Sequence, residues 1–261
     1  MIAEIGRFLD LTEAGLAGFI LVFARVGGVM ALLPGFGEQM IPARVRLGLT
    51  VAFAMVVWPM VAATSPGAPA EASWPFLAML LVEALIGLLL GLGARLLLLG
   101  LQFAGTVIAQ STSLAQLLGG GVTPEPMPAM GALLALGGMT LAVATGLHVK
   151  AALLIARSYE VLPMGLVPAG TDVATWGVAR VASSFALGFS LAAPFVIAAF
   201  AYNLALGAIN RAMPQLMVSF IGAPAAMGGG ILLLMLAAPV ILRHWNAAFD
   251  ALLADPLAMP R

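Results

Sequence analysis

The sequence predicts an all-α polytopic membrane protein with about six to seven apolar helices. Of its 261 residues, 62% are hydrophobic and only 8% are charged, whereas a soluble domain carries about 25% charged residues. The apolar residues fall into long runs separated by short breaks rich in glycine and proline. Backbone groups inside a bilayer must form hydrogen bonds within their own segment, so each long run is expected to form a helix.

The first apolar run is long enough to cross a bilayer. It covers residues 11–33, about 34 Å as a helix. Acidic residues lie near its start, where a signal peptide would be basic, so we expect a helix that is retained. The further expected helices are Val45 to Ala63, Trp74 to Ala94, Leu96 to Leu118, Ala129 to Val149, Ala182 to Ile209 and Ala225 to Leu242.

The third and fourth runs form one stretch from Trp74 to Leu118 that is more than twice the length of a spanning helix. Arg95 lies near its middle, and an arginine at a turn reaches the interface more cheaply than one at the bilayer centre. We therefore expect a hairpin of two helices that turns near Arg95. Seven helices with an outside N-terminus then place most basic residues in the cytoplasm: Arg44, Arg46, Arg95, Lys150, Arg157, Arg180, Arg243 and Arg261.

Two charged residues, Arg25 and Glu83, fall inside predicted helices. Each would cost roughly 2.5 to 3.5 kcal/mol at the centre of a spanning helix. Their opposite signs favour a structural ion pair that locks the first helix against the third. The alternative is a small secondary transporter with Glu83 as a proton site and helices interrupted at Pro194 and Pro239. Against it, no inverted repeat relates the two halves of the sequence.

The sequence contains no catalytic or cofactor-binding constellation. His148 and His244 lack the spacing of a metal site, and Lys150 lacks the glycine-rich frame of a phosphate-binding loop. There is no cysteine, and 11 basic residues balance 11 acidic ones, so no basic field attracts nucleic acid. We therefore expect no enzyme activity, no cofactor, no metal and no nucleic-acid partner.

Two polar breaks carry more specific information. Residues 119–128 contain three Gly and three Pro, which excludes a helix. This segment is either an exposed turn or a plug, because irregular backbone at membrane depth must be buried in protein or line a cavity. Residues 210–224 are similarly open to two interpretations, since this second break could simply cap two helices.

The chain resembles the FliR/SctT family of export-gate proteins from bacterial flagella and type III secretion injectisomes. The resemblance covers essentially the whole chain in the family's order. Four stretches carry it: Pro34-Gly35-Phe36-Gly37 with Pro42-Ala43-Arg44-Val45-Arg46, the segment Gln110 to Pro128, Tyr159-Glu160-Val161-Leu162-Pro163-Met164-Gly165, and Asn210-Arg211-Ala212-Met213-Pro214-Gln215 with Gly222-Ala223-Pro224.

This resemblance implies a noncatalytic subunit of the flagellar type III protein export gate, which passes unfolded flagellar subunits. Its partners would be FliP-like and FliQ-like subunits, an FlhB-like gate protein and the flagellar basal body in the bacterial inner membrane. An injectisome homologue is the alternative, although the Asn-Arg then Pro-Gln pattern looks more like the flagellar branch. Residues 1–261 would form a single integral-membrane domain, with helical hairpins packed against neighbouring subunits as well as lipid.

The resemblance also assigns roles to residues. The plug loop would be Gly119, Gly120, Gly121, Val122, Thr123, Pro124, Glu125 and Pro126, and polar contacts around the pore would come from Gln110, Ser111, Ser113 and Gln116. The assembly motif would be Asn210, Arg211, Pro214, Gln215, Gly222 and Pro224. Thr123 and Met217 depart from the family pattern, where Asp and Asn are common.

Besides the export-gate subunit and the small secondary transporter, a third hypothesis is a membrane scaffold without a conduit, in which the loop is an inert turn.

Overall fold

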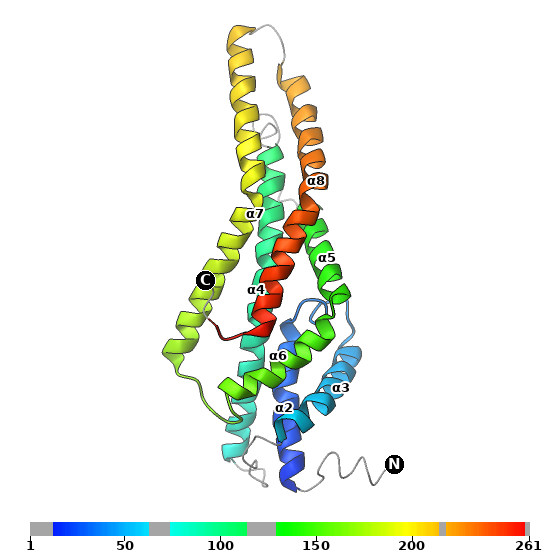
Figure 1. Ribbon diagram of the computed structural model, residues 1–261, viewed down its shortest axis with the longest axis vertical. Helices are drawn as coiled ribbons and strands as arrows, with labels where there is room; N and C mark the ends of the chain where they lie inside the picture. The colour runs from blue at the N-terminus through cyan, green and yellow to red at the C-terminus, as the bar shows by residue number, and fades with distance from the viewer. Residues whose placement is uncertain (1–12, 63–73, 114–128, 214–217, 259–261) are drawn as a thin grey trace. The chain divides into compact units, whose positions relative to one another are not determined.

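The fold is all-α, as predicted. The computed structural model describes residues 13–62, 74–113, 129–213 and 218–258 (Figure 1). Five of the described helices are long and apolar enough to cross a membrane, and α5 with α6 would make a sixth span. The helices are α2 (Glu13–Leu32), α3 (Ala43–Ala62), α4 (Trp74–Ser113), α5 (Ala129–Ala144), α6 (Leu147–Val161), α7 (Gly170–Ala212) and α8 (Val218–Ala254).

The predicted hairpin at Arg95 is wrong, because α4 is one continuous helix of 40 residues. The arginine needs no turn, since its guanidinium forms an ion pair with the carboxylate of Glu38 in the connection between α2 and α3. Arg46 Nη2 also donates to the Glu38 carbonyl oxygen, at 2.9 Å. The count of seven spanning helices fails with the hairpin, because residues 74–113 supply one span and not two.

Other helix boundaries also differ from the predicted ones. The run 129–149 is divided into α5 and α6, and Gly146 between them has a φ of 86°, which glycine adopts without a steric penalty. Helix α7 begins at Gly170, twelve residues before the predicted start at Ala182. Pro194 and Pro239 lie inside continuous helices, so the interruptions expected of a transporter are not present at these positions.

The chain divides into two compact units. Unit 1 comprises Met1–Leu96, Ala142–Val181 and Ala248–Arg261, and unit 2 comprises Leu97–Leu141 and Ala182–Ala247. Helices α4, α5, α7 and α8 contribute residues to both units.

In unit 1, α2 is the central helix, and its backbone meets that of α4. A Cβ atom on Gly28 would lie 2.5 Å from the Ala84 carbonyl oxygen, and one on Gly87 would collide with the Arg25 carbonyl oxygen. Gly91 belongs to the same contact, since its Cβ would lie 2.9 Å from the Val29 carbonyl oxygen. The small residues therefore serve packing within the chain, where direct backbone approach replaces the hydrophobic effect.

Polar side chains of α6 and α7 hold the end of α8 in unit 1. Trp176 Nε1 donates to the Pro256 carbonyl oxygen at 3.0 Å, and Arg157 Nη1 donates to the Ala254 carbonyl oxygen at 3.0 Å. Lys150 Nζ lies 2.6 Å from Asp250 Oδ1. The two hydrogen bonds give partners to carbonyl groups at and just beyond the end of α8, which the helix itself cannot satisfy, and the ion pair joins α6 to α8.

In unit 2, glycine again allows close helix packing. A Cβ on Gly100 of α4 would lie 2.5 Å from the Ser184 carbonyl oxygen of α7, and Gly105 of α4 lies against Gly131 of α5. Trp245 of α8 is fully buried and donates through Nε1 to the Leu97 carbonyl oxygen at 2.8 Å. The four helices of this unit are thus joined by backbone contact and one buried indole.

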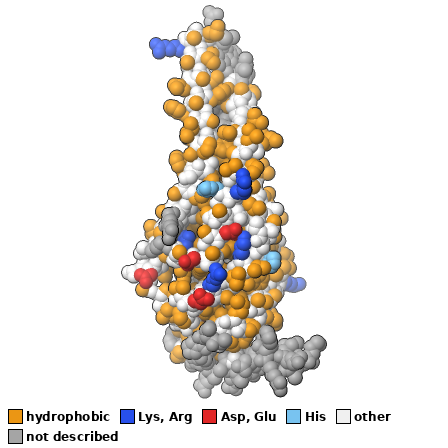
Figure 2. Space-filling view, viewed as in Figure 1, with side chains coloured by type: hydrophobic (Ala, Val, Ile, Leu, Met, Phe, Trp, Pro, Cys, Tyr) orange, Lys and Arg blue, Asp and Glu red, His pale blue; other side chains and the backbone are white. Residues whose placement is uncertain are grey.

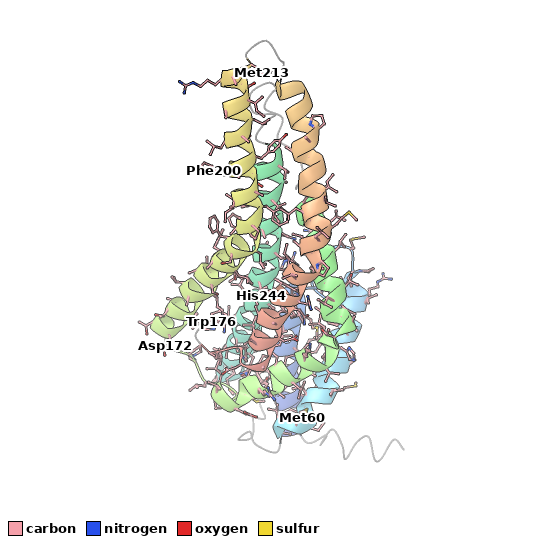
Figure 3. The ribbon with its side chains drawn as sticks, turned by 45° about the horizontal axis from the view of Figure 1, so that its top comes forward. Met60, Asp172, Trp176, Phe200, Met213 and His244 are labelled. Atoms are coloured by element: carbon pink, nitrogen blue, oxygen red, sulfur yellow. The ribbon has the colours of Figure 1, made fainter. Side chains whose placement is uncertain are left out.

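The outer faces of α7 and α8 in unit 2 are strongly apolar. Hydrophobic side chains are spread over the whole length of the face seen in Figure 2, among backbone and other side chains, and the labelled Phe200 projects away from α7 in Figure 3. Phe200 is 70% exposed. Such a surface requires lipid or another protein subunit beside it. The exposed large side chains include Phe185, Phe189, Ile197, Phe200, Leu204, Ile231, Leu232, Met235, Leu236 and Val240.

Candidate functional site

The predicted plug loop falls outside the described residues, which break off at Ser113 and resume at Ala129. Gln116, Pro214 and Gln215 also lie outside them, and of Ser113 only the backbone is described. The site is therefore built from the residues that border these segments. They are the end of α4, the start of α5, and the facing parts of α7 and α8.

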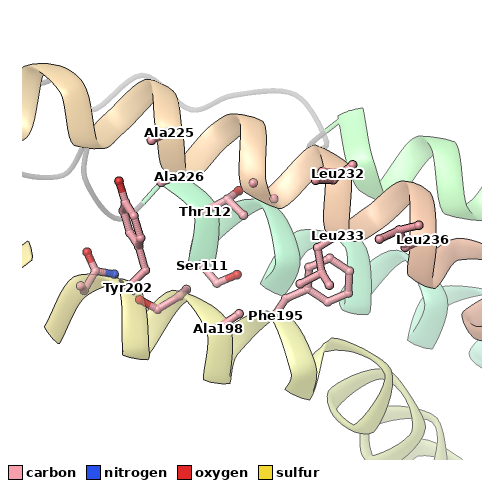
Figure 4. Close-up of a pocket in the computed structure, with 14 residues that line it drawn as sticks. Ser111, Thr112, Phe195, Ala198, Tyr202, Ala225, Ala226, Leu232, Leu233 and Leu236 are labelled. Carbon is pink, nitrogen blue, oxygen red and sulfur yellow. Dashed lines mark hydrogen bonds between the residues drawn. The ribbon is translucent and has the colours of Figure 1, made fainter. Parts of the chain in front are cut away.

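A cavity of about 350 Å³ lies at the end of α4 in unit 2. Its walls come from α4, α7 and α8, and it is lined mainly by small and apolar side chains, as Figure 4 shows. Polar atoms enter it from Ser111, Thr112, Tyr202 and Asn203. The remaining lining residues are Phe195, Ala198, Ala199, Ala225, Ala226, Gly229, Gly230, Leu232, Leu233 and Leu236.

The serine and threonine hydroxyl groups of this cavity are satisfied by their own helix. Ser111 Oγ donates to the Ile108 carbonyl oxygen at 2.8 Å, and Thr112 Oγ1 donates to the Ala109 carbonyl oxygen at 2.9 Å. Gln110 is exposed and does not line the cavity. The wall is therefore mainly apolar, and its serine and threonine hydroxyls are already engaged.

The described part of the assembly motif lies at the end of α7 and the start of α8. Asn210, Arg211 and Pro224 are exposed, whereas Gly222 is buried. Tyr202 OH donates to the Gly222 carbonyl oxygen at 2.8 Å, which ties the two helices together. The motif thus combines an internal contact at its glycine with an outward-facing arginine.

The structure brings Arg25 and Glu83 together in unit 1. Arg25 Nε lies 2.6 Å from Glu83 Oε2, and both side chains have no exposed surface. The pair connects α2 with α4 at the point where the two helix backbones meet. An ion pair in such a dry environment persists only when its remaining polar atoms also find partners.

Those partners come from α6 and the turn that follows it. Arg25 Nη1 donates to Ser158 Oγ and Nη2 donates to the Leu162 carbonyl oxygen, each at 3.0 Å. Tyr159 OH donates to Glu83 Oε2 at 3.1 Å, and the Gly165 backbone N–H donates to Glu83 Oε1 at 2.9 Å. The network therefore fixes three helices and one turn.

The aromatic ring of Tyr159 also contacts the guanidinium group of Arg25 directly. Arg25 Cζ lies 3.6 Å from the centroid of the Tyr159 ring, and this ring is almost completely buried. A guanidinium over an aromatic face is stabilised by the ring quadrupole, most strongly where water is excluded. The sequence reasoning missed Ser158, Tyr159 and Gly165 as partners, although the stretch 159–165 had been singled out for its resemblance to a family.

Among the residues with a described placement, no group of three or more His, Cys, Asp or Glu side chains could hold a metal ion. The three ion pairs found there each join two different elements of unit 1. The class of protein defined by these features is a polytopic helical membrane protein with a buried ion-pair network in unit 1 and an apolar cavity at the end of α4 in unit 2.

Comparison with known proteins identifies the family. Residues 16–252 match the family described as Bacterial export proteins, family 1, and the chain belongs to that family. It is 35% identical to the flagellar biosynthetic protein FliR of Caulobacter vibrioides over 89% of this chain and 93% of that protein. It is 31% identical to the FliR protein of Pectobacterium carotovorum, over 92% of each chain.

A relative from an injectisome is more distant than these two. The Yop proteins translocation protein T of Yersinia pestis is 26% identical over 96% of each chain. The chain is therefore an integral membrane subunit of the flagellar type III protein export gate, in a family of structural export-gate components. The flagellar assignment has more support than the injectisome alternative.

Proposed function

We propose that this chain is a noncatalytic subunit that helps to form and close the channel of the export gate in the bacterial inner membrane, at the flagellar basal body. Unfolded flagellar subunits pass through that channel. FliP-like and FliQ-like subunits and an FlhB-like gate protein are the proposed partners. The apolar outer faces of α7 and α8 support this assembly, because they need a dry environment that a neighbouring subunit would supply.

The observation that carries the proposal is the placement of the two described helix ends, of α4 and α5 in unit 2, between which the Gly/Pro-rich segment runs in the sequence. The segment connects the end of α4 to the start of α5, two helices whose backbones meet at Gly105 and Gly131. Its sequence disfavours regular helix, and the cavity of about 350 Å³ borders the last described turn of α4. We infer from these flanking helices and from the composition of the segment that it acts as the displaceable plug.

The contacts of Arg25 and Glu83 support a structural function for this pair and not a proton site. Every nitrogen of the guanidinium and both oxygens of the carboxylate have a partner within 3.1 Å. A proton acceptor of a transporter would need access to water and a carboxylate able to change its charge. Here both oxygens of Glu83 are already engaged by Arg25, Tyr159 and the Gly165 N–H, and the side chain has no exposed surface.

Deletion of residues 119–126 in the assembled gate tests the plug. Membranes that contain the deletion variant should leak ions or small solutes, because the closing element is gone. Assembly is checked by purification through a C-terminal tag and mass spectrometry of the bound subunits. A matched control changes Pro124 and Pro126 to Ser and keeps the segment's length, so that the channel stays closed. Unchanged permeability of a fully assembled deletion variant would remove the plug assignment.

A further inference from the structure

Unit 1 contains a cavity of its own, which the proposed plug in unit 2 does not use. Its volume is about 490 Å³, within the range of about 300 to 1,000 Å³ that is usual for ligand-binding cavities. This unit 1 groove has among its lining residues Ile86, Leu90, Leu166, Val167, Asp172 and Trp176. We propose that it binds a segment of a partner polypeptide, which places a large apolar side chain in the groove and a lysine or arginine beside Asp172.

The groove has a buried apolar floor and an exposed apolar rim. Ile86 and Leu90 of α4 and Trp176 of α7 line it and are themselves buried. At the rim, Leu166 is 48% exposed and Val167 is 70% exposed, both in the connection between α6 and α7. Contiguous exposed apolar residues around a cavity mark a binding surface, whereas scattered ones do not. The groove therefore suits the apolar part of a ligand.

Hydrogen bonds hold the walls of the groove in place. The indole of Trp176 is fixed by its bond to the Pro256 carbonyl oxygen, at 3.0 Å. The connection after α6 is fixed by the buried ion pair, because Arg25 donates to the Leu162 carbonyl oxygen and the Gly165 N–H donates to Glu83. A site whose walls are already ordered loses little conformational entropy when a ligand binds.

Asp172 gives the groove its charge. Among the described residues that line the groove, it is the only charged one, and it is exposed in the first turn of α7, about one turn before Trp176 (Figure 3). None of the ion pairs between described residues includes Asp172. An apolar surface with one unpaired carboxylate is complementary to an apolar segment that carries a cation.

The same carboxylate and the nearby backbone favour a polypeptide over a phospholipid. The phosphate of a phospholipid would lie against Asp172 and be repelled by it. Within the described chain, neither the backbone N–H nor the carbonyl oxygen of Val167 has a hydrogen-bond partner. Residues 166–169 are neither helix nor strand. An extended peptide laid beside Val167 would pair with both backbone groups, as in other complexes that add a strand.

The test places the photo-cross-linking residue p-benzoylphenylalanine at Val167 of the full-length chain in its native membranes. The matched control carries the same probe at Val178, which is 71% exposed on α7 in unit 1 but does not line the groove. Cross-linked peptides are identified by mass spectrometry after irradiation. We expect the probe at Val167 to capture one polypeptide segment in which a lysine or arginine stands next to a large apolar residue, and the probe at Val178 not to capture it.

Substitutions in the probe-bearing chain test the chemistry of the groove. Asp172→Asn should lower the yield of the cross-link about threefold, the equivalent of about 0.6 kcal/mol for an exposed ion pair. Asp172→Lys reverses the charge and should lower the yield further, whereas Asp172→Glu should retain most of it. Ala169→Trp keeps the charge but fills the groove, so the cross-link should disappear. Thermal unfolding midpoints show that each variant compared is folded.

Several outcomes would overturn the proposal. One is a yield at Val167 no higher than at Val178, and another is an equal yield in the wild type and in both Asp172→Asn and Asp172→Lys. Cross-links at Val167 only to phospholipid would assign the groove to lipid, and cross-links only to this chain itself would remove the partner. None of these results depends on the plug, because membrane leakage in the deletion variant concerns unit 2.

Discussion

Arg25 Nε lies 2.6 Å from Glu83 Oε2, and the two residues are 58 positions apart in the sequence. Helices α2 and α4 provide one residue each, and α6 with its following turn completes the site. Ion pairs buried in a low-dielectric interior contribute little net stability relative to apolar residues, yet removal of one partner leaves an uncompensated charge. We therefore infer that the main role of the Arg25–Glu83 pair is to specify that α2 packs against α4, and not to add net stability.

Single and double substitutions of the pair should therefore differ sharply. Arg25→Met or Glu83→Leu alone should destabilise the protein by about 3 to 5 kcal/mol, because each leaves a buried charge without its partner. The double variant should recover part of this loss, though not all, because the Gly165 N–H then lacks an acceptor, at a cost of about 1 to 3 kcal/mol. Unfolding in detergent, followed by circular dichroism, measures these differences.

The same residues distinguish a gate from a transporter. Glu83→Gln should reduce the amount of folded, assembled protein without any change in proton-coupled solute uptake by vesicles that contain it. Selective loss of proton-coupled uptake by a fully folded variant would instead support the transporter hypothesis.

Tyr159 should contribute through both its hydroxyl and its ring. Tyr159→Phe removes the hydrogen bond to Glu83 but keeps the aromatic face 3.6 Å from Arg25 Cζ, so the loss should be about 1.5 kcal/mol. Tyr159→Leu also removes the cation–π contact and should lose about 2 kcal/mol more. The comparison uses denaturant unfolding of the two variants under identical conditions. Equal stability of Phe and Leu variants would show that the ring makes no separate contribution.

The contact between α2 and α4 should be intolerant of even one added methyl group. Gly87→Ala would bring a Cβ into the Arg25 carbonyl oxygen, so the two helices must separate and the charged network between them must distort. Gly48→Ala in α3 is the matched control, because a Cβ there meets nothing within 4 Å. That control should be neutral or stabilising by up to about 1 kcal/mol, since alanine favours the helix. Thermal unfolding midpoints of both variants, measured in the same detergent, would reveal the difference.

The helical class and most apolar runs could be predicted from the sequence, because hydropathy and the need for internal backbone hydrogen bonds act locally. The pairing of Arg25 with Glu83 could be suggested on the same basis, since two opposite charges inside apolar runs have few other partners. Tyr159 and Gly165 could not be assigned to that site by sequence. Tyrosine is found in many environments, so its position in the sequence does not indicate a partner. The hydrogen bond from Gly165 to Glu83 uses the backbone N–H, which every residue except proline has, so no sequence pattern indicates it.

The error at Arg95 has a similar origin. The cost of an arginine inside an apolar run was correctly recognised, but a carboxylate 57 positions away removes that cost without a turn. A hydropathy profile includes the charge of Arg95, but it contains no information that Glu38 lies beside Arg95 in the folded protein. Likewise, the division between α5 and α6 depends on the backbone conformation of one glycine, Gly146, in a chain that contains 30 glycines.

Continuity of α4 through Arg95 can be tested by hydrogen exchange of the detergent-solubilised protein. In a continuous helix the amides of residues 92–98 are hydrogen-bonded within the helix and should exchange slowly. A hairpin turn near Arg95 would leave several of these amides open to solvent, and they would exchange quickly. The exposed residues Val167 and Ala169, in the non-helical connection between α6 and α7, provide the fast-exchanging reference within the same molecule. Substitution of Glu38 by Gln should leave residues 92–98 protected, because the intrahelical bonds and not the ion pair maintain the helix; fast exchange of this segment in the wild type would restore the hairpin.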